Sequence, residues 1–392
     1  MFILDDLYVS DEVLDFLEES QELVLDNATA QRLALSRTLN ICSEEKARTI
    51  LAQPGSRLCA LSEMNLDVAK RICNAETAQA IELFKNKAAM RRALKPLYPN
   101  YVFEEYTFQQ LSALDASKVA YPVVVKPSTG FFSLGIFPVF NEEQWHCAME
   151  DIKAHSASWS DVYNTTVVNN SDFLVESYIE GEEYAVDAYL DEEGQVVVLN
   201  VLRHDFAGTD DVSDRLYFTS ADVIKSQIVS MTAFLTKANE VFGLRDFPFH
   251  VEVRKQPDGS IVPIEFNPLR FAGLCTTDVS YFAYGFKTYE YFLQNKRPNW
   301  ETLLEGKDSL TYPMMLLTKP GFDATKPYVF DYAALRGRFR NILKLRETDF
   351  ALLSTFGFVF PETRVQDWDS EIAPLLSSNL EEFLTYENHE PA

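Results

Sequence analysis

The chain has 392 residues, of which 47% are hydrophobic and 13% aromatic, a composition typical of a folded globular protein and unlike that of a disordered chain. Its 59 acidic and 35 basic residues leave a net charge of −24, which disfavours general binding to nucleic acid or to anionic membranes. An anionic ligand would therefore need a local cluster of basic residues.

The cysteines and the start of the chain predict a cytoplasmic protein. The five cysteines are widely spaced and form no CxxC or Cys/His motif, so we expect reduced thiols. The first residues contain no basic region followed by a long apolar run, and therefore predict no signal peptide. No stretch approaches the length of a transmembrane helix.

The first 75 residues alternate short apolar runs with helical patterns. The apolar runs predict strands at 2–4, 23–25 and 58–61, and helices are expected to begin near Ser10 and Ser43. Strands separated by helices indicate a small α/β domain with parallel strands. The region carries no GxGxxG motif, so a dinucleotide site is not indicated.

Residues 76–95 show a helical pattern with a basic side. The apolar positions fall on one stripe, and the opposite side carries Lys85, Lys87, Arg91, Arg92 and Lys95. A solvated helix face is the more common explanation of such a run, and a local anion site in an acidic protein is the alternative.

A possible phosphate-binding loop follows the β-branched run that ends at Lys126. The loop contains Gly130 and Gly135 together with hydroxyl side chains, and a second apolar run follows it. Glycines let backbone N–H groups approach an anion, and lysine supplies a charge. The pattern differs from a P-loop because the lysine precedes the glycines. A hairpin with a glycine-rich turn explains the segment equally well.

The middle of the chain predicts several further strands and one long helix. Strands at 173–179 and 183–189 flank an acidic connection, and a third strand at 195–202 leads to a polar loop at 207–213. An amphipathic helix is expected at 225–242.

The segment 249–270 predicts an antiparallel hairpin. Asp258-Gly259 suits a two-residue turn, which would pair Pro257 with Ser260 and place Glu252 opposite Glu265. The same register places His250 opposite Asn267. The alternation of side chains puts Val251, Val253, Ile264 and Phe266 on one face and Glu252, Glu265 and Asn267 on the other.

Two facing carboxylates repel each other unless a cation lies between them. Oxygen ligands of this kind suit Mg²⁺, which takes one or two carboxylates and fills its remaining positions with water and phosphate. The alternative is an ordinary exposed hairpin with acidic outer residues. Beyond the hairpin, residues 281–292 predict a helix, and apolar runs at 312–317, 339–345 and 356–360 indicate a strand-rich C-terminal portion.

In their order along the chain, these segments resemble the ATP-grasp superfamily. The resemblance covers roughly residues 76–275, and its four parts are Asn86–Arg91, Val125–Gly135, Leu174–Glu183 and the hairpin with His250-Val-Glu252 and Ile264-Glu-Phe-Asn267. It implies an α+β and α/β fold class, with two subdomains gripping a nucleotide. The expected division is an N-terminal α/β pre-grasp domain at 1–75, a grasp core at 76–275 with subdomains at about 76–172 and 173–275, and a C-terminal portion at 276–392.

The resemblance also implies roles for individual residues. Lys87 and Lys126 look like phosphate-contacting lysines, and Ser133 to Gly135 like the loop over the triphosphate. The remaining implied contacts are the adenine hinge Glu176, Ser177, Tyr178 and Ile179, the ribose carboxylate Glu183, and the metal ligands Glu252, Glu265 and Asn267. The implied cofactors are ATP and Mg²⁺, with Mn²⁺ as a substitute.

Two features depart from the family pattern. Many members place an arginine two residues after the metal-ligating asparagine, where it steadies the substrate carboxylate, whereas Arg270 stands three residues after Asn267. A guanidinium there could still clamp a carboxylate if the loop bends. Phe131 and Phe132 occupy loop positions where smaller residues are common.

The resemblance implies an ATP-dependent ligase that forms C–N bonds through an acyl phosphate, with Arg270 and Lys126 at the reacting groups. Its expected partners are a small-molecule carboxylate and an amine, including amino acids, and it allows a homodimer. Arg203, His204 and Arg215 are further candidate substrate contacts, with ordinary loop charge as the alternative. Open alternatives are a carboxylase-like or nucleotide-biosynthetic enzyme, a non-catalytic ATP-binding module, and a ligase acting on a protein amine.

Overall fold

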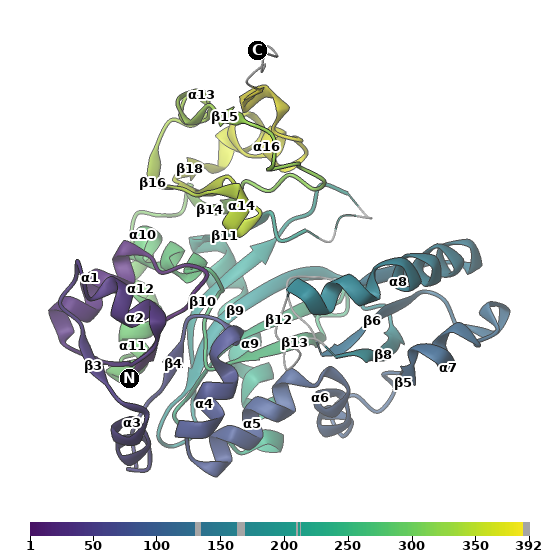
Figure 1. Ribbon diagram of the computed structural model, residues 1–392, viewed down its shortest axis with the longest axis horizontal. Coiled ribbons are helices and arrows are strands. Elements are labelled where there is room, and N and C mark those ends of the chain that lie inside the picture. Colours follow the sequence, from purple (N-terminus) through teal and green to yellow (C-terminus); the bar gives the residue numbers. More distant parts are fainter. Residues whose placement is uncertain (130–134, 163–168, 209–210, 212, 387–392) are drawn as a thin grey trace.

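The computed structural model describes residues 1–129, 135–162, 169–208, 211 and 213–386. In Figure 1 the N-terminal elements lie on the left, the elements from β5 to β8 on the right, and the C-terminal elements at the top, all around a large central sheet. None of the helices in these described ranges is long and apolar enough to cross a membrane.

The N-terminal elements form a four-stranded parallel sheet in the order β3-β2-β1-β4. Its strands are β1 (Phe2–Ile3), β2 (Leu23–Leu25), β3 (Asn40–Cys42) and β4 (Cys59–Ala60), and its helices are α1 (Asp11–Ser20), α2 (Ala28–Leu33) and α3 (Glu44–Leu51). Ser10 and Ser43 cap α1 and α3 through their hydroxyls, as the sequence predicts. The short strand β3 is an addition to the predicted elements.

The predicted helix at 76–95 is two helices, α5 (Ala75–Lys85) and α6 (Lys87–Leu94), which follow α4 (Leu66–Ile72). The break lies at Asn86, whose extended backbone ends α5 and whose side chain accepts the N–H of Ala89 at 2.8 Å as the N-cap of α6. The break turns Lys87 and Arg91 into the molecule, where they are 6% and 4% exposed. The solvated-face interpretation is therefore wrong for these two residues, whereas Arg92 and Lys95 are exposed.

A second four-stranded sheet has the order β5-β8-β6-β7 and is antiparallel. Its elements are β5 (Phe103–Thr107), α7 (Phe108–Ser112), β6 (Val123–Thr129), β7 (Phe137–Val139), α8 (Glu142–Val162) and β8 (Asn169–Ser177). The buried side chains of Val125, Trp145 and Phe173 form its separate core.

The central sheet follows the order β13-β12-β9-β10-β11-β14-β17-β16, with β18 also paired to β14. Its elements before the hairpin are β9 (Glu182–Leu190), β10 (Val196–His204), β11 (Leu216–Ser220) and α9 (Ala221–Phe242). Helix α9 packs on β10 and buries Ile224, Met231 and Leu235. The resulting layers are a sheet covered by helices on the side away from the cleft described below.

The predicted hairpin is present as β12 (Phe247–Lys255) and β13 (Ile261–Pro268). Glu252 pairs with Glu265 and His250 with Asn267, as predicted. The turn is longer by one residue, because Gln256 rather than Pro257 pairs with Ser260. A bulge opposite Glu252 and Val253 offsets this extra turn residue and restores the predicted pairing. The bulge also turns Ile264 toward the cleft described below, so the prediction that Ile264 faces the core is wrong.

The C-terminal strands extend the central sheet. They are β14 (Leu310–Leu316), β16 (Ile342–Glu347), β17 (Gly357–Pro361) and β18 (Thr363–Arg364), while β15 (Tyr328–Phe330) and β19 (Leu384–Tyr386) form a two-stranded sheet. The helices of this part are α10 (Val279–Tyr284), α11 (Thr288–Leu293), α12 (Trp300–Leu303), α13 (Tyr332–Arg336), α14 (Phe350–Leu353), α15 (Trp368–Glu371) and α16 (Ala373–Leu376). The predicted helix at 281–292 is thus two helices, because Gly285 ends α10 in a left-handed conformation.

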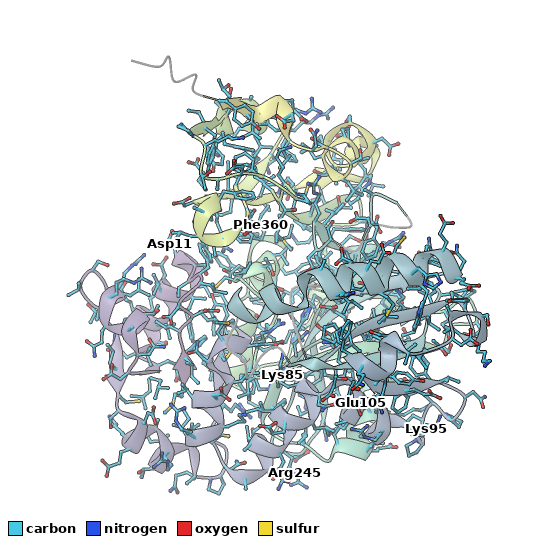
Figure 2. All side chains as sticks on the ribbon, turned by 45° about the vertical axis from the view of Figure 1, so that its right-hand side comes forward. Asp11, Lys85, Lys95, Glu105, Arg245 and Phe360 are labelled. Carbon is cyan, nitrogen blue, oxygen red and sulfur yellow. The ribbon has the colours of Figure 1, made fainter. Side chains whose placement is uncertain are left out.

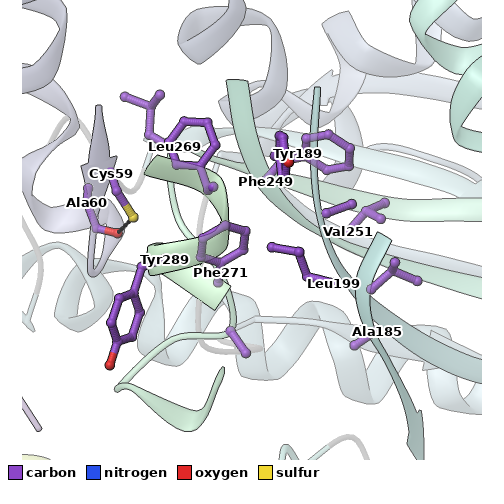
Figure 3. Close-up of a cluster of buried hydrophobic side chains, with 14 of the residues drawn as sticks. Cys59, Ala60, Ala185, Tyr189, Leu199, Phe249, Val251, Leu269, Phe271 and Tyr289 are labelled. Carbon is purple, nitrogen blue, oxygen red and sulfur yellow. Dashed lines mark hydrogen bonds between the residues drawn. The ribbon is translucent and has the colours of Figure 1, made fainter. Parts of the chain in front are cut away.

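The N-terminal sheet joins the central sheet through one hydrophobic core. The N–H of Ala60 donates to the carbonyl of Leu269 at 2.7 Å, directly after β13. Figure 3 shows Cys59 and Ala60 next to Leu269, Phe271 and Tyr289. The segment that follows the hairpin is therefore held by the first strands of the chain.

Candidate active site

Two adjoining cavities form a cleft over one face of the central sheet. The first has a cavity volume of about 140 Å³ and the second of about 100 Å³. The side chains that line both are Lys126, Ile136, Asp214, Glu252 and Ile264. The cleft thus lies where the second sheet, through β6, faces the hairpin and its neighbouring strands.

A row of side chains crosses the central sheet along the floor of this cleft. In the strand registers Arg254 pairs with Glu183, Glu183 with His204, His204 with Tyr217, and Tyr217 with Met314. Directly paired residues project from the same face of a sheet. The row therefore joins the second cavity, which Arg254, Glu183 and His204 line, to the first, which Tyr217 and Met314 line.

The hairpin carboxylates face each other beside Lys87. The ammonium of Lys87 lies 2.7 Å from Glu265 Oε2, and Asn267 Nδ2 donates to Glu265 Oε1 at 3.2 Å. Burial would raise the pKa of Glu265, but Lys87 lowers it well below its usual range. Burial and the charge of Glu265 raise the pKa of Glu252 well above its usual range. A cation at this pair would stabilise the ionised form of Glu252.

The predicted hinge carboxylate Glu176 is the centre of a buried ionic cluster. Lys126 Nζ lies 2.6 Å from its Oε1, and Arg91 Nε donates to its Oε2 at 2.7 Å. Burial alone would raise the pKa of Glu176, but the charges of Arg91 and Lys126 lower it to about 2. Burial lowers the pKa of Lys126, and Arg91 and Lys87 add to this effect. Lys126 therefore lies close to two further cations, Arg91 and Lys87, and each of the three is paired with a carboxylate.

The rest of the hinge lines the second cavity. Ser177, Tyr178 and Ile179 contribute to its wall together with Glu176. Arg254 Nη1 donates to the carbonyl of Ile179 at 2.8 Å, and its guanidinium lies 5.1 Å from the ring centroid of Tyr178. The hinge is therefore fixed to the hairpin strand β12.

The predicted ribose carboxylate Glu183 lies in the same cavity with two cationic partners. Its Oε1 is 2.8 Å from His204 Nδ1, and its Oε2 accepts from Arg254 Nε at 2.9 Å. Burial raises the pKa of Glu183, but His204 and Arg254 lower it below its usual value. The carboxylate is consequently an ionised acceptor with a fixed orientation.

The loop after Lys126 is described in part. Gly135 has a φ of 72°, a left-handed conformation that favours glycine, whereas Ser133, Phe131 and Phe132 lie outside the described residues. Ser128 Oγ is buried and has no hydrogen-bond partner in the described part of the chain. A buried hydroxyl without a partner is uncommon in folded proteins.

Arg270 reaches the first cavity although it stands one residue later than the family pattern. Leu269 has a φ of 58°, so the backbone turns sharply before the arginine. Arg270 Nη2 lies 3.1 Å from Glu63 Oε1, and its Nη1 donates to the carbonyl of Phe271 at 3.0 Å. The turn thus brings Arg270 into the lining of the first cavity, where its guanidinium is paired with Glu63.

Two other candidate substrate contacts do not line either of these cavities. Arg215 donates to the carbonyls of Leu375 at 3.2 Å and Leu376 at 3.3 Å and so fastens the C-terminal part. Arg203 pairs with Asp205 at 2.8 Å. Of the three residues proposed around the polar loop, His204 alone lies in the cleft.

The sequence alone assigns no role to four residues that line the cleft. They are Glu63, Asp214, Tyr217 and Arg254. The four-residue spacing of Lys87 and Arg91 on one helix face was a usable signal. Glu63 and Asp214 reach the site only through long-range folding, for which single segments give no signal.

Comparison with known proteins identifies the domain and the fold. Residues 119–278 match the family model of the ATP-grasp domain. The structure of an L-amino acid ligase from Bacillus licheniformis is 17% identical, with a TM-score of 0.68 over 98% of this chain and 97% of that chain. An N5-carboxyaminoimidazole synthase from Aspergillus clavatus, in complex with ADP and 5-aminoimidazole ribonucleotide, is 14% identical, with a TM-score of 0.62 over 97% and 98%.

A biotin carboxylase from Campylobacter jejuni, in complex with β,γ-ATP, is 13% identical, with a TM-score of 0.61 over 92% of this chain and 87% of that chain. These likenesses confirm the predicted fold class, with its mixed sheets and helices. Residues 119–278 therefore match the ATP-grasp domain, and the chain as a whole has the fold of these three proteins.

Proposed function

We propose that the protein is an ATP-dependent carboxylate–amine ligase that acts on small molecules. In the proposed reaction a substrate carboxylate attacks the γ-phosphate of ATP, ADP leaves, and an amine then displaces phosphate from the acyl phosphate. The observation that carries the proposal is the meeting of two buried lysines with a pair of facing carboxylates in one cleft. Phosphoryl transfer depends on this kind of positioning and charge neutralisation.

The proposed phosphate site consists of Lys87, Lys126 and Ser128. In the protein as described, both lysines are paired with carboxylates, and Ser128 Oγ is buried without a partner among the described residues. Triphosphate oxygens would accept from all three groups. The loop containing Ser133 and Gly135 belongs to the same proposed site. Lys126 is expected to hold the transferring phosphoryl group, since its charge lies at the junction of both cavities.

The proposed metal ligands Glu252, Glu265 and Asn267 fit Mg²⁺, and Mn²⁺ as a substitute. No group of three or more His, Cys, Asp or Glu side chains that could hold a metal ion occurs in the described ranges. Two carboxylates and one amide oxygen suit an ion that is completed by water and phosphate. Bound there, the cation would neutralise charge on the transferring phosphate. The raised pKa of Glu252 supports the fit, because a cation would relieve its repulsion from Glu265.

The other proposed contacts concern the nucleoside and the acid. The hinge from Glu176 to Ile179 would meet adenine, and Glu183 would accept from ribose hydroxyls. Arg270 would hold the substrate carboxylate in two-pronged fashion, which fixes the attacking oxygen. The described nucleotide complexes of the carboxyaminoimidazole synthase and the biotin carboxylase support the choice of nucleotide.

A second candidate is a carboxylase-like reaction in which bicarbonate is the activated acid. The likeness to a biotin carboxylase and to a carboxyaminoimidazole synthase favours it. Both candidates share the nucleotide site and differ in the acid, so one screen separates them.

The test is an ATP-dependent phosphate-release screen over amino acids and small acids, singly and in pairs, with bicarbonate as a separate arm. We expect release that requires both an acid and an amine, and Glu265→Gln should reduce it by more than a hundredfold. Glu240→Gln, an exposed carboxylate on α9, is the control and should leave release unchanged. Release with bicarbonate alone would favour the carboxylase, and normal activity of Glu265→Gln would exclude the proposed metal site.

A further inference from the structure

The first cavity, which Arg270 lines, also has an apolar wall. Its apolar lining residues are Leu202, Ala272, Leu274, Met314 and Leu316. Its charged lining residues are Glu63, Lys87, Lys126, Asp214, Glu252, Glu265 and Arg270. A ligand that placed a carboxylate at Arg270 would therefore meet both a charged surface and an apolar one.

Strand β14 supplies two of these apolar residues, because side chains alternate between the two faces of a strand. Met314 and Leu316 line the cavity, whereas the intervening Met315 is packed in the separate core on the other face of the sheet. Met314 is paired with Tyr217 on the neighbouring strand. The wall is thus built into the sheet and depends on a strand from the C-terminal part of the chain.

Asp214 lies at the border between the two cavities and is held in place. Its Oδ1 accepts from the hydroxyl of Tyr217 at 2.8 Å, and the ring of Tyr217 stacks on His204 with centroids 4.0 Å apart. Burial raises the pKa of Asp214, and the charges of Glu183 and Glu265 add to this effect. Because Asp214 lines both cavities, its carboxylate is an acceptor that an ammonium group in the first cavity could meet.

We propose that this end of the cleft is the binding site of a substrate amino acid with a large apolar side chain. Arg270 meets the carboxylate, Asp214 meets the ammonium group, and Met314 and Leu316 select the side chain. The inference rests on the proposed ligase function and names the class of acid that the reaction activates. A hydrophobic pocket distinguishes side chains by the apolar surface that they bury, typically by ten- to hundredfold for one or two carbon groups.

Direct binding tests the side-chain part without relying on turnover. Leucine, alanine and serine are titrated into the full chain by calorimetry, with Mg²⁺ and a non-hydrolysable ATP analogue present and, in a second series, absent. We expect leucine to bind at least tenfold more tightly than alanine or serine. The nearly isosteric change Met314→Gln should remove most of this preference, while Leu352→Gln, at a position that is 76% exposed, should keep it. Thermal unfolding checks that both variants are folded.

Equal affinities for leucine and serine, or no binding of leucine in either series, would overturn the inference. So would an unchanged preference in folded Met314→Gln. The ligase proposal is distinguishable, because phosphate release with other acids and without leucine binding would preserve the ligase and exclude the apolar site. Leucine binding that depends on Met314, with no release for any pair, would keep the site and exclude the ligase.

A second pair of ligands tests the ammonium contact. 4-Methylpentanoate has the carboxylate and side chain of leucine but no amino group. We expect Asp214→Asn to weaken leucine binding by about tenfold or more and to leave 4-methylpentanoate binding unchanged. An equal loss for both ligands would mean that Asp214 only supports the wall, and it would overturn the assignment of the ammonium site.

Discussion

At the scale of single residues, the cleft is dominated by buried ionic pairs. Arg91, Lys126 and Glu176 are each at most 4% exposed. Removing one member of a buried pair leaves an uncompensated charge, which is far more costly than losing a surface pair. The same pairs keep the lysines ordered where phosphates are proposed to bind, so stability and function depend on the same contacts.

Two arginines on one helix allow a matched test of this point. Arg91→Met should lower the free energy of unfolding by about 3 kcal/mol, because Glu176 loses a buried partner. Arg92→Met, whose side chain is 56% exposed and pairs with Glu105, should change it by less than about 1 kcal/mol. Urea unfolding measures both, and equal effects would contradict the buried-pair account.

The depressed pKa of Glu176 predicts a loss of stability in acid. Its pKa is about 2 in the folded protein and 4.5 in its unperturbed form, so its contribution is fully present above pH 4.5 and is lost as the pH falls toward 2. Glu176→Gln should be less stable at pH 7, and its stability should fall less than that of the wild type across this window. If the free energy of unfolding changed with pH by the same amount in both proteins, the pKa of Glu176 would not be lowered on folding, and the prediction would be wrong.

At the scale of elements, the hinge and the hairpin are in backbone contact at Gly181. Gly181 has a φ of 126°, and a Cβ there would lie 2.2 Å from the carbonyl oxygen of Lys255. Gly259, in the hairpin turn, has a φ of 85° but open space around it. An alanine at Gly259 would therefore test the cost of a left-handed backbone alone, whereas an alanine at Gly181 would add a steric clash to that cost.

Gly181→Ala should displace the hinge from β12, reduce stability by more than about 3 kcal/mol and weaken ATP binding. Gly259→Ala should cost only the strain of a left-handed residue, about 1 kcal/mol, and leave ATP binding unchanged. Thermal unfolding and nucleotide titration measure the two effects. A Gly181→Ala variant with normal nucleotide affinity would show that the hinge is not part of the site.

The hairpin also shows how far the sequence predicts an element. Asp258-Gly259 and the alternation of side chains predict Glu252 opposite Glu265, and the structure has this pair. The pair is correct because the one-residue-longer turn and the one-residue bulge at Ile264, neither of which the sequence indicates, cancel in the register. The break between α5 and α6 at Asn86 was also not predicted, because the apolar stripe continues across it. The only local sign of two helices is Asn86 itself, a residue that suits an N-cap.

At the scale of the whole molecule, one buried cluster fastens distant parts of the chain together. Arg346 on β16 lies 2.8 Å from Glu12 on α1 and 2.6 Å from Asp278, and it donates to the carbonyl of Cys275 at 2.9 Å. Figure 2 labels Asp11 and Phe360 where these two ends of the chain meet. The cluster thus holds the segment that forms one wall of the first cavity, through Leu274 and Thr276.

Arg346→Met should destabilise the protein by about 3–5 kcal/mol, because Glu12 and Asp278 would remain buried without this cation. Arg338→Met, at an exposed position, should have little effect. Amide hydrogen exchange should show faster exchange around residues 273–278 in Arg346→Met alone. Unchanged protection there would mean that the cluster does not support the cavity wall.

The motifs on single segments, in their order along the chain, were sufficient to predict the superfamily fold. Contacts that join distant segments were not predictable, because the periodicity of one segment does not say what it packs against. Glu63 with Arg270, and Asp214 with Tyr217, are examples of such contacts. The domain boundary at 275/276 remains a prediction. The strands that follow it, β14, β17 and β16, belong to the same sheet as the strands that precede it.

The central claim is that an acid is activated as an acyl phosphate in this cleft. The most direct measurement uses the acid found in the release screen, labelled with ¹⁸O in its carboxylate, with ATP, Mg²⁺ and the amine. The account predicts that one ¹⁸O atom appears in the released phosphate, because the carboxylate oxygen attacks the γ-phosphate and stays with it. Phosphate released without the label would contradict the account.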